Sequence, residues 1–292
     1  MAKQMKILVA YDGSTCANAA LDDLRRAGLP NNAQFKVLSV VEHWLPPPSG
    51  LEIVEHISRD QEYLELAMRA AVRLKEIRAG WDVKTEVAVG SPGTVIVEKA
   101  DQWKPDLIVV GSHGRTAIGR FLLGSVSQKV LHEARCSVSV SRGRVEELNT
   151  PVRLIIGIDG SESAEAAVNA VISRNWPAGS EARVVNAAWT IPTITSEYMT
   201  GPMIDWFIKE EKRIKEMVDA DLGKLNAAGL RAEAIINEEE PKRLLASEAE
   251  SWGADCIFVG ARGMGMIERF LIGSVSSAVA ARAHCSVEVV RV

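Results

Sequence analysis

The sequence predicts an α/β fold that is built twice, as two tandem domains in which strands alternate with helices. Short apolar segments alternate with longer amphipathic segments along all 292 residues, an order typical of a parallel sheet covered by helices. The second half also repeats the first, since residues 108–142 align with residues 257–291 without a gap and roughly half of the aligned positions are identical. We expect domains at residues 1–145 and 151–292, joined by a linker within residues 142–151.

The elements of each half follow from the apolar pattern. The longest helical segment keeps Leu64, Leu74 and Ile77 on one face, and Pro92 suits the first turn of a helix. The expected elements of the first half are strand 7–11, helix 17–27, strand 35–41, helix 52–78, strand 83–89, helix 94–103, strand 107–110, helix 126–133 and strand 138–140. In the second half we expect strands near residues 154, 183, 232, 257 and 287 and helices at 164–174 and 204–227.

Five parallel strands joined by helices predict a doubly wound sheet in each half, with the Rossmann-like, flavodoxin-like strand order 3-2-1-4-5. In such sheets a ligand binds beyond the carboxyl ends of the strands, where the winding direction reverses. That point lies between the first and fourth strands, which end at Asp12 and Gly111 in one half and at Asp159 and Gly260 in the other. We therefore expect an aspartate and a glycine loop to meet in each half.

The glycine loop that leads from the fourth strand to a helix has features of a phosphate site. Gly111, Gly114 and Gly124 precede a predicted helix, and the second half repeats their spacing. Glycines let the main chain approach an anion closely, and the N–H groups of a helix's first turn point toward it. Ser125 and Ser127 offer hydroxyl donors, and the aspartate can accept hydrogen bonds from ribose. The pattern predicts a nucleotide site in each half.

Other phosphate and metal motifs are absent from the sequence. Residues 119–125 resemble a P-loop but have Leu123 before the last glycine and no lysine after it, and no Gly-x-Gly-x-x-Gly follows either first strand. His132 lies near Cys136, but its counterpart in the second half is Ala281, so we expect no metal site. The four cysteines form no Cys-x-x-Cys pair and are expected to be reduced and buried.

Composition and charge limit the classes of partner. Apolar residues make up 47% and charged residues 25% of the chain, and the net charge is −4, which is typical of a globular protein. A surface for nucleic acid or for an anionic membrane would need a basic excess, so neither partner is expected. No apolar run approaches the roughly 20 residues that span a bilayer, and the N-terminus has no signal-peptide pattern. We expect a cytoplasmic protein.

These motifs resemble the universal stress protein family in its tandem two-domain form. The resemblance rests on Val-Gly-Ser-His-Gly-Arg at residues 110–115, on the Gly-x2-Gly-x9-Gly-Ser spacing, and on Asp-Gly-Ser at residues 12–14. It covers essentially the whole chain, once per half. It implies a regulatory role in the stress response and binding of ATP together with Mg²⁺, because family members with this motif bind ATP.

The resemblance also implies nucleotide contacts residue by residue. Tyr11 and Asp12 match the positions that hold the adenosine, and Val40 matches the residue that lies against adenine. The matching positions of the first half are Tyr11, Asp12, Val40, Gly111, Ser112, His113, Gly114, Arg115, Gly124, Ser125, Val126 and Ser127. Those of the second half are Ile158, Asp159, Ala187, Gly260, Ala261, Arg262, Gly263, Gly273, Ser274, Val275 and Ser276.

The second half departs from the motif at two places. Ser112-His113 becomes Ala261-Arg262, and Arg115-Thr116 becomes Met264-Gly265. In addition, the valine that lies against adenine becomes the smaller Ala187. The lost hydroxyl and the looser packing are expected to weaken the second site, although Arg262 offers a cationic partner for phosphate. We still expect both halves to bind nucleotide.

Two other functions stay open at this point. The sequence shows no nucleophile with a neighbouring general base in both halves, so we expect no catalytic residues and a binding protein rather than a dedicated enzyme. A slow ATPase or nucleotide-transferring enzyme is one alternative. A nucleotide-free interaction scaffold, in which the glycines only form turns, is the other.

The final strand of each half is an exposed edge in the predicted sheet. Strands 138–140 and 287–290 are alternating or apolar, and exposed edges pair readily with other strands. In the resembled family such strands join two domains. We expect the two halves to pair as a built-in dimer, and association of two chains into a homodimer stays open.

Overall fold

The computed structural model describes residues 4–42, 52–114, 123–143, 150–187, 201–263 and 272–292, the side chains of residues 52–59 and 203 excepted. The first half contains β1 (Lys6–Ala10), α1 (Thr15–Asp23), β2 (Gln34–Val41), α2 (Glu52–Ile77), β3 (Asp82–Val89), α3 (Pro92–Trp103), β4 (Leu107–Gly111), α4 (Ser125–Glu133) and β5 (Ser137–Ser141). The second half contains β6 (Arg153–Gly157), α5 (Glu162–Ile172), β7 (Glu181–Asn186), α6 (Gly201–Ala227), β8 (Arg231–Ile236), α7 (Pro241–Trp252), β9 (Cys256–Gly260), α8 (Ser274–Arg282) and β10 (Ser286–Val290).

The ten strands of the described residues form one sheet, in the order β3-β2-β1-β4-β5-β10-β9-β6-β7-β8. Within each half the neighbouring strands are parallel, so the predicted order 3-2-1-4-5 is confirmed in both. The halves meet at β5 and β10, which pair antiparallel with Ser139 opposite Glu288. The predicted pairing of the final strands is also confirmed, and it converts two sheet edges into one continuous ladder.

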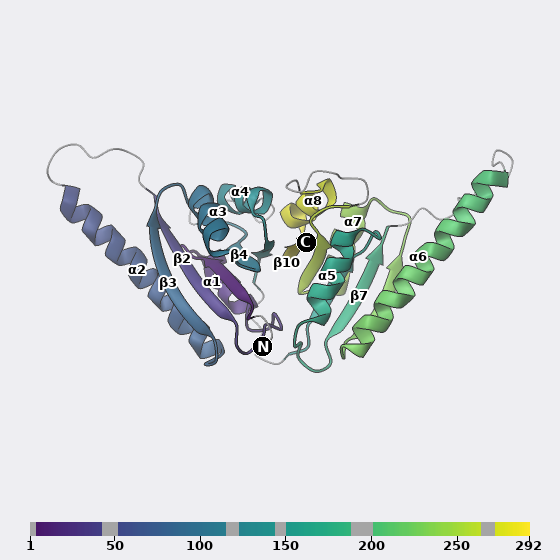
Figure 1. Cartoon of the computed structure of the whole chain (residues 1–292), viewed down its shortest axis with the longest axis horizontal. Helices are drawn as coiled ribbons and strands as arrows, with labels where there is room; N and C mark the ends of the chain where they lie inside the picture. Colours follow the sequence, from purple (N-terminus) through teal and green to yellow (C-terminus); the bar gives the residue numbers. More distant parts are fainter. Residues whose placement is uncertain (1–3, 43–51, 115–122, 144–149, 188–200, 264–271) are drawn as a thin grey trace.

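Helices cover both faces of this sheet (Figure 1). On one face α3, α4, α7 and α8 pack on a single apolar cluster that spans both halves, from Leu8 and Ile108 to Ile155 and Ile257. On the other face α1 and α2 cover a separate cluster in the first half, and α5 and α6 cover one in the second. The long helices α2 and α6 lie on the two outer flanks of the molecule. No helix in the described ranges is both long enough and apolar enough to cross a membrane.

The helices begin where the sequence supplies caps. Ser14 Oγ accepts a hydrogen bond from Ala17 N (3.1 Å) at the start of α1, and Ser161 Oγ accepts one from Ala164 N (3.2 Å) at the start of α5. The predicted helix 17–27 begins earlier and ends earlier, at residues 15 and 23. It ends early because the following residues form short turns that direct Arg26 into the second half.

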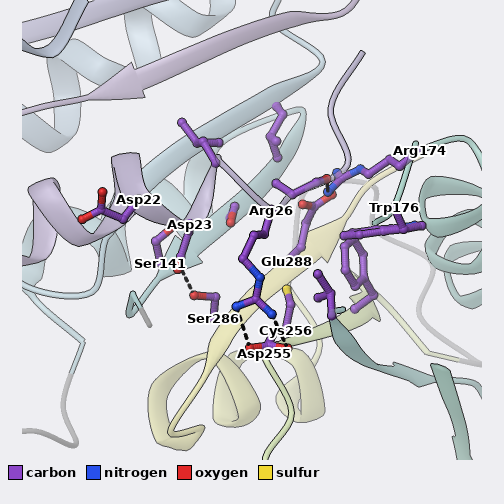
Figure 2. A pocket seen from close by; sticks show the side chains of 16 residues that line it. Asp22, Asp23, Arg26, Ser141, Arg174, Trp176, Asp255, Cys256, Ser286 and Glu288 are labelled. Carbon is purple, nitrogen blue, oxygen red and sulfur yellow. Dashed lines mark hydrogen bonds and ion pairs between the residues drawn. The ribbon is translucent and has the colours of Figure 1, made fainter. Parts of the chain in front are cut away.

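Two buried arginines hold the two halves together beside the β5–β10 ladder (Figure 2). Arg26 donates to both carboxylate oxygens of Asp255 (3.2 and 3.3 Å) and to Pro151 O (2.8 Å). Arg174 donates across to Ala27 O (3.3 Å) and pairs with Glu288 of its own half, and the Arg174 and Glu288 side chains are at most 5% exposed. A cavity of about 60 Å³ lies between these residues. That volume holds a few water molecules rather than a nucleotide, so we assign this region to assembly of the halves.

The cysteines behave as small apolar side chains. All four are free, and Cys285 is buried while the other three are partly buried. Burial raises the pKa of the Cys136 thiol to about 11 and also raises that of Cys256. Protonated thiols of this kind are poor nucleophiles.

Candidate functional site

A cleft of about 630 Å³ opens at the carboxyl ends of β1, β2 and β4 in the first half. This is where the winding direction of the sheet reverses, the place at which ligands of such folds bind. The predicted site residues that line the cleft are Tyr11, Asp12, Val40, Gly111, His113, Gly114, Gly124, Ser125, Val126 and Ser127. Segments that lie far apart in the sequence therefore come together as the topology predicted.

Asp12 lies directly against the glycine loop. Its Oδ1 accepts a hydrogen bond from Ser14 N (3.0 Å), and a Cβ placed on Gly114 would lie 3.1 Å from its Oδ2. In the second half a Cβ on Gly263 would lie only 2.7 Å from Asp159 Oδ2. A side chain at either glycine would push the loop away from the carboxylate, so both halves build the same aspartate–glycine contact.

Gly111 and Gly260 serve a purpose that the sequence did not indicate. A Cβ on Gly111 would lie 2.8 Å from the main-chain carbon of Cys16, and one on Gly260 would lie 2.5 Å from that of Ser163. These distances are too short for any side chain. The two glycines therefore let the first turn of α1 or α5 approach the end of β4 or β9, in addition to lining the clefts.

The first turn of α4 forms the opposite wall of the cleft. Gly124 is the N-cap and makes no side-chain cap, so the first-turn N–H groups are directed at the cleft without a competing side chain. Ser127 lines the cleft, and its Oγ donates to Gly111 O (2.6 Å). That its hydroxyl contacts phosphate stays a prediction. Ser276 Oγ donates to Gly260 O in the same way (2.5 Å). Both hydroxyls fasten the glycine loop to its helix.

Two predicted site residues do not line the clefts. Ser112 is 5% exposed and Ala261 is 2% exposed, and Ser112 Oγ faces Cys16 Sγ at 3.8 Å. Each follows the last strand residue, so its side chain turns into the packing between strand and helix. The loss of the Ser112 hydroxyl in the second half therefore removes no group that lines the cleft. Arg115 lies outside the described residues.

The second half has its own cleft, of about 430 Å³, at the carboxyl ends of β6, β7 and β9. Among its lining residues are Ile158, Asp159, Ala187, Gly260, Arg262, Gly263, Gly273, Ser274, Val275 and Ser276, all of which the sequence predicted. The same strand ends, glycine loop and helix N-terminus thus recur at equivalent positions.

Sequence reasoning missed the lateral walls of both clefts. The first also contains Ala10, Ala17, Leu38, Glu42, Tyr63, Ser91, Pro92, Gly93, Ile96, Val110 and Lys129. The second also contains Gly157, Ala164, Val185, Asn186, Pro241, Leu244, Leu245 and Val259. The repeat itself held one usable signal, because Pro92 and Pro241 occupy equivalent places after the third strand of each half.

The two clefts differ in their charged groups. In the first, burial lowers the pKa of His113, and the nearby Arg142 guanidinium lowers that pKa further. Arg262 occupies the equivalent place in the second cleft and brings a guanidinium group there. Lys129 lines the first cleft, with its Nζ 2.9 Å from Glu133 Oε1, and its counterpart is Ala278. Both clefts thus offer a cation to an anionic ligand, from different elements.

Comparison with known proteins adds to this geometry. The sequence model of the universal stress protein family matches residues 4–142 and again residues 152–291. The chain belongs to the universal stress protein family. Membership in this family supports a role in the response to stress.

Several universal stress proteins match this chain, some over its whole length and some over one half. One from Mycobacterium tuberculosis H37Rv is 27% identical over 300 residues, which is 99% of this chain and 98% of that protein. Universal stress protein A homolog 2 of Coxiella burnetii is 33% identical over 141 residues, 47% of this chain and 94% of that protein. A solved universal stress protein from Archaeoglobus fulgidus gives a TM-score of 0.67 at 19% identity, covering 98% of this chain and 96% of that one. At that identity the last comparison shows the fold alone.

Proposed function

We propose that this chain binds ATP in one site per half and acts as a regulatory protein in the stress response. The proposal rests on one observation above all, which is the contact between an aspartate and a glycine loop at the mouth of each half-sheet. Asp12 and Gly114 make it in the first half, and Asp159 and Gly263 make it in the second. A duplicated anion-binding main chain beside a duplicated carboxylate matches the phosphate and ribose parts of a nucleotide.

Each part of the cleft has a place in this proposal. The apolar wall that includes Val40 and Ile96 is suited to the adenine ring. Asp12 accepts hydrogen bonds from the ribose hydroxyls, and the glycine loop together with the first turn of α4 binds the phosphates. Ala187, Asp159 and α8 have the same places in the second half.

Mg²⁺ accompanies ATP in this proposal, with the phosphates as its main ligands. In the described part of the chain no cluster of three or more His, Cys, Asp or Glu side chains could hold a metal ion. Mg²⁺ commonly binds through phosphates, waters and one or two carboxylates, and Asp12 and Asp159 each lie beside a glycine loop. The cytoplasmic location, the domain boundaries at 145 and 151, and the association of two chains stay predictions.

Released nucleotide tests the proposal most directly. One sample of the purified protein is denatured, and its supernatant is analysed for adenine nucleotides. A second sample is freed of nucleotide without denaturation and is titrated calorimetrically with MgATP. We expect adenine nucleotide in the supernatant and a stoichiometry of two per chain, one for each cleft. Absence of nucleotide together with no binding at millimolar ATP would favour the scaffold. Steady-state turnover that Asp12→Ala abolishes would favour the enzyme.

A further inference from the structure

Arg142, which follows β5, crosses from the first half into the second. Its Nη2 donates to the main-chain oxygens of Ala280 (2.7 Å) and Ala281 (3.2 Å), near the end of α8. Its Nη1 donates to Cys285 O (3.5 Å), and its main-chain N donates to Ser286 Oγ (2.9 Å). The side chain therefore binds carbonyl groups at the carboxyl end of a helix in the other half.

Arg291, which follows β10, makes the reciprocal crossing. Its Nη2 donates to Leu131 O (2.7 Å) in α4, and its Nη1 donates to Cys136 O (3.3 Å) just after that helix. Its main-chain N donates to Ser137 Oγ (3.2 Å). The antiparallel pairing of the final strands places each arginine beside the last helix of the opposite half.

The helices whose carbonyl groups bind these arginines also line the two clefts with their first turns. Ser125 begins α4 in the first cleft, and Ser274 begins α8 in the second. Each helix has nine residues and is therefore only about 13 Å long. A cation bound to the terminal carbonyls stabilises such a helix. Because the helix is short and rigid, holding its carboxyl end also fixes where its N-terminal amides lie.

Each arginine is also adjacent to the glycine loop of its own half. Ser141, next to Arg142, accepts a hydrogen bond from Ser112 N (3.0 Å), and Val290, next to Arg291, accepts one from Ala261 N (2.7 Å). One short segment thus connects the loop of one cleft with the helix of the other. This connection is made twice, once in each direction.

We infer that Arg142 positions the phosphate-binding end of α8 in the second site and that Arg291 positions that of α4 in the first. Each site therefore depends on an arginine from the opposite half, and the sites are coupled through β5 and β10. This inference rests on the proposed binding of ATP. Arg142 and Arg291 are positioning residues, because neither lines a cleft.

Calorimetric titration of the full chain with ATP tests the crossed dependence. Gly124→Val removes the first site and Gly273→Val the second, so each background reports one site. With Gly124→Val, we expect Arg142→Ala to weaken ATP binding about fivefold or more, a typical coupling between sites, and Arg291→Ala to have a smaller effect. With Gly273→Val, which leaves the first site, we expect Arg291→Ala to have the larger effect and Arg142→Ala the smaller one. Stronger effects on the arginine's own half, or equal effects on both sites, would overturn the inference.

Arg26→Ala is the matched control, because Arg26 also crosses the interface but binds Asp255 and Pro151 rather than a cleft helix. We expect it to lower the thermal midpoint without a crossed change in affinity. Arg142→Lys keeps the charge but loses the fork of donors, and we expect it to restore affinity in part. If the control shows the same crossed pattern, the effect comes from the interface in general and the inference fails.

Hydrogen exchange of the nucleotide-free chain separates this inference from the proposed function. We expect Arg142→Ala to speed exchange of the amides of α8 and not of α4, and Arg291→Ala to do the opposite. Unaltered exchange in α8 and α4 would overturn the positioning role even if ATP binds. Failure of the unmodified chain to bind ATP would reject the proposed function, while the exchange pattern would still test which helix each arginine holds.

Discussion

The first and second clefts share a main chain but differ in side chains. Both have the aspartate–glycine contact, the glycine N-cap and the serine that fastens the loop to its helix. The first is larger, at about 630 Å³ against 430 Å³, and Tyr63 from α2 lines it, whereas no described residue of α6 lines the second. Duplication has kept the glycine loop, the aspartate and the serine, and has changed other side chains that line the clefts.

Charge is the clearest of these differences. Lys129 on α4 lines the first cleft, where burial and Arg142 lower the pKa of the loop histidine, His113. In the second cleft α8 has Ala278 at the lysine's position, and the cation is Arg262 in the loop. A ligand with several phosphates can use a cation at either place. The two clefts thus share the main chain that would bind an anion, while the neighbouring cation comes from the helix in one and from the loop in the other.

A third difference lies where the second strand of each half ends. Ser39 Oγ donates to Tyr11 O (2.7 Å), and Asn186 Nδ2 donates to Ile158 O (2.8 Å). The two side chains thus tie the second strand to the first in the same way. Asn186 also lines its cleft, whereas Ser39 does not line the first, and the buried Asn186 Oδ1 has no hydrogen-bond partner within the described ranges.

The largest effect is expected from a side chain at the helix N-caps. A Cβ on Gly124 would lie 3.4 Å from His113 Cα and Ser112 O, so the fold tolerates it while the remaining atoms of valine occupy the space for phosphate. Gly124→Val should weaken the first site by roughly 100-fold or more, equivalent to about 2.7 kcal/mol. Gly273→Val should do the same to the second.

Calorimetric stoichiometry falling from two to one per chain would check this prediction. Gly124→Ala is the graded control, with a smaller loss, and circular dichroism verifies that each variant is folded. An unchanged affinity after Gly124→Val would mean that phosphate binds at another loop.

The aspartates should have the next largest effect, of similar size in both halves. Asp12→Asn and Asp159→Asn keep the shape of the side chain but remove its charge, and hydrogen bonds to charged groups contribute about 1.5–3 kcal/mol. We expect roughly tenfold weaker ATP binding at the altered site. Comparison with 2′,3′-dideoxy-ATP, which lacks the ribose hydroxyls, shows whether the loss is specific. Equal losses for both nucleotides would contradict a ribose contact.

Moving the lysine from the first cleft to the second should have a smaller effect on ATP affinity. It should weaken binding in the first cleft and strengthen it in the second. Lys129→Ala removes a partly exposed cation from the first cleft, and Ala278→Lys adds one to the second. Because exposed charges are screened by salt, each change should alter ATP affinity by only about threefold at low ionic strength. Titrations at two salt concentrations check this, and a salt-independent change would argue against an electrostatic role for the lysine.

Lowering the pH should have the smallest effect, a change in the ATP affinity of the first cleft relative to that of the second. Burial and Arg142 hold the pKa of His113 below its ordinary value, so it gains charge only when the pH falls below that range. First-site affinity relative to the second should rise severalfold at most as His113 charges, because the second cleft has an arginine, Arg262, in place of this histidine. Because protonation of ATP affects both sites alike, it cancels in the ratio of the two affinities. His113→Gln should flatten the ratio, and a ratio independent of pH in the unmodified chain would exclude the histidine from the site.

The same lowered pKa has a consequence for stability. Between the folded pKa of His113 and its ordinary value, the unfolded chain binds more protons than the folded one. The contribution of this residue to stability is therefore present above its ordinary pKa and is lost as the pH falls through that window. Thermal unfolding of the nucleotide-free chain, with His113→Gln for comparison, measures this loss.

The sequence by itself determined the layered fold, the strand order and the place of both clefts. Apolar strands alternating with helices leave few topologies, and a parallel order of 3-2-1-4-5 necessarily brings the ends of the first and fourth strands together. For that reason Asp12 and the glycine loop that starts at Gly111 could be paired from positions about a hundred residues apart. The repeat made the same prediction for the second half without further assumptions.

The tertiary structure alone decided what several of these residues do. Gly111 is required by the approach of α1, Ser127 donates to the glycine loop, and Arg142 reaches a helix of the other half. Local sequence patterns report periodicity and turns, but they carry no record of which atoms from distant segments come within a few ångströms. The first two contacts arise when the first half folds, and the contact of Arg142 arises only when the two halves pack across β5 and β10.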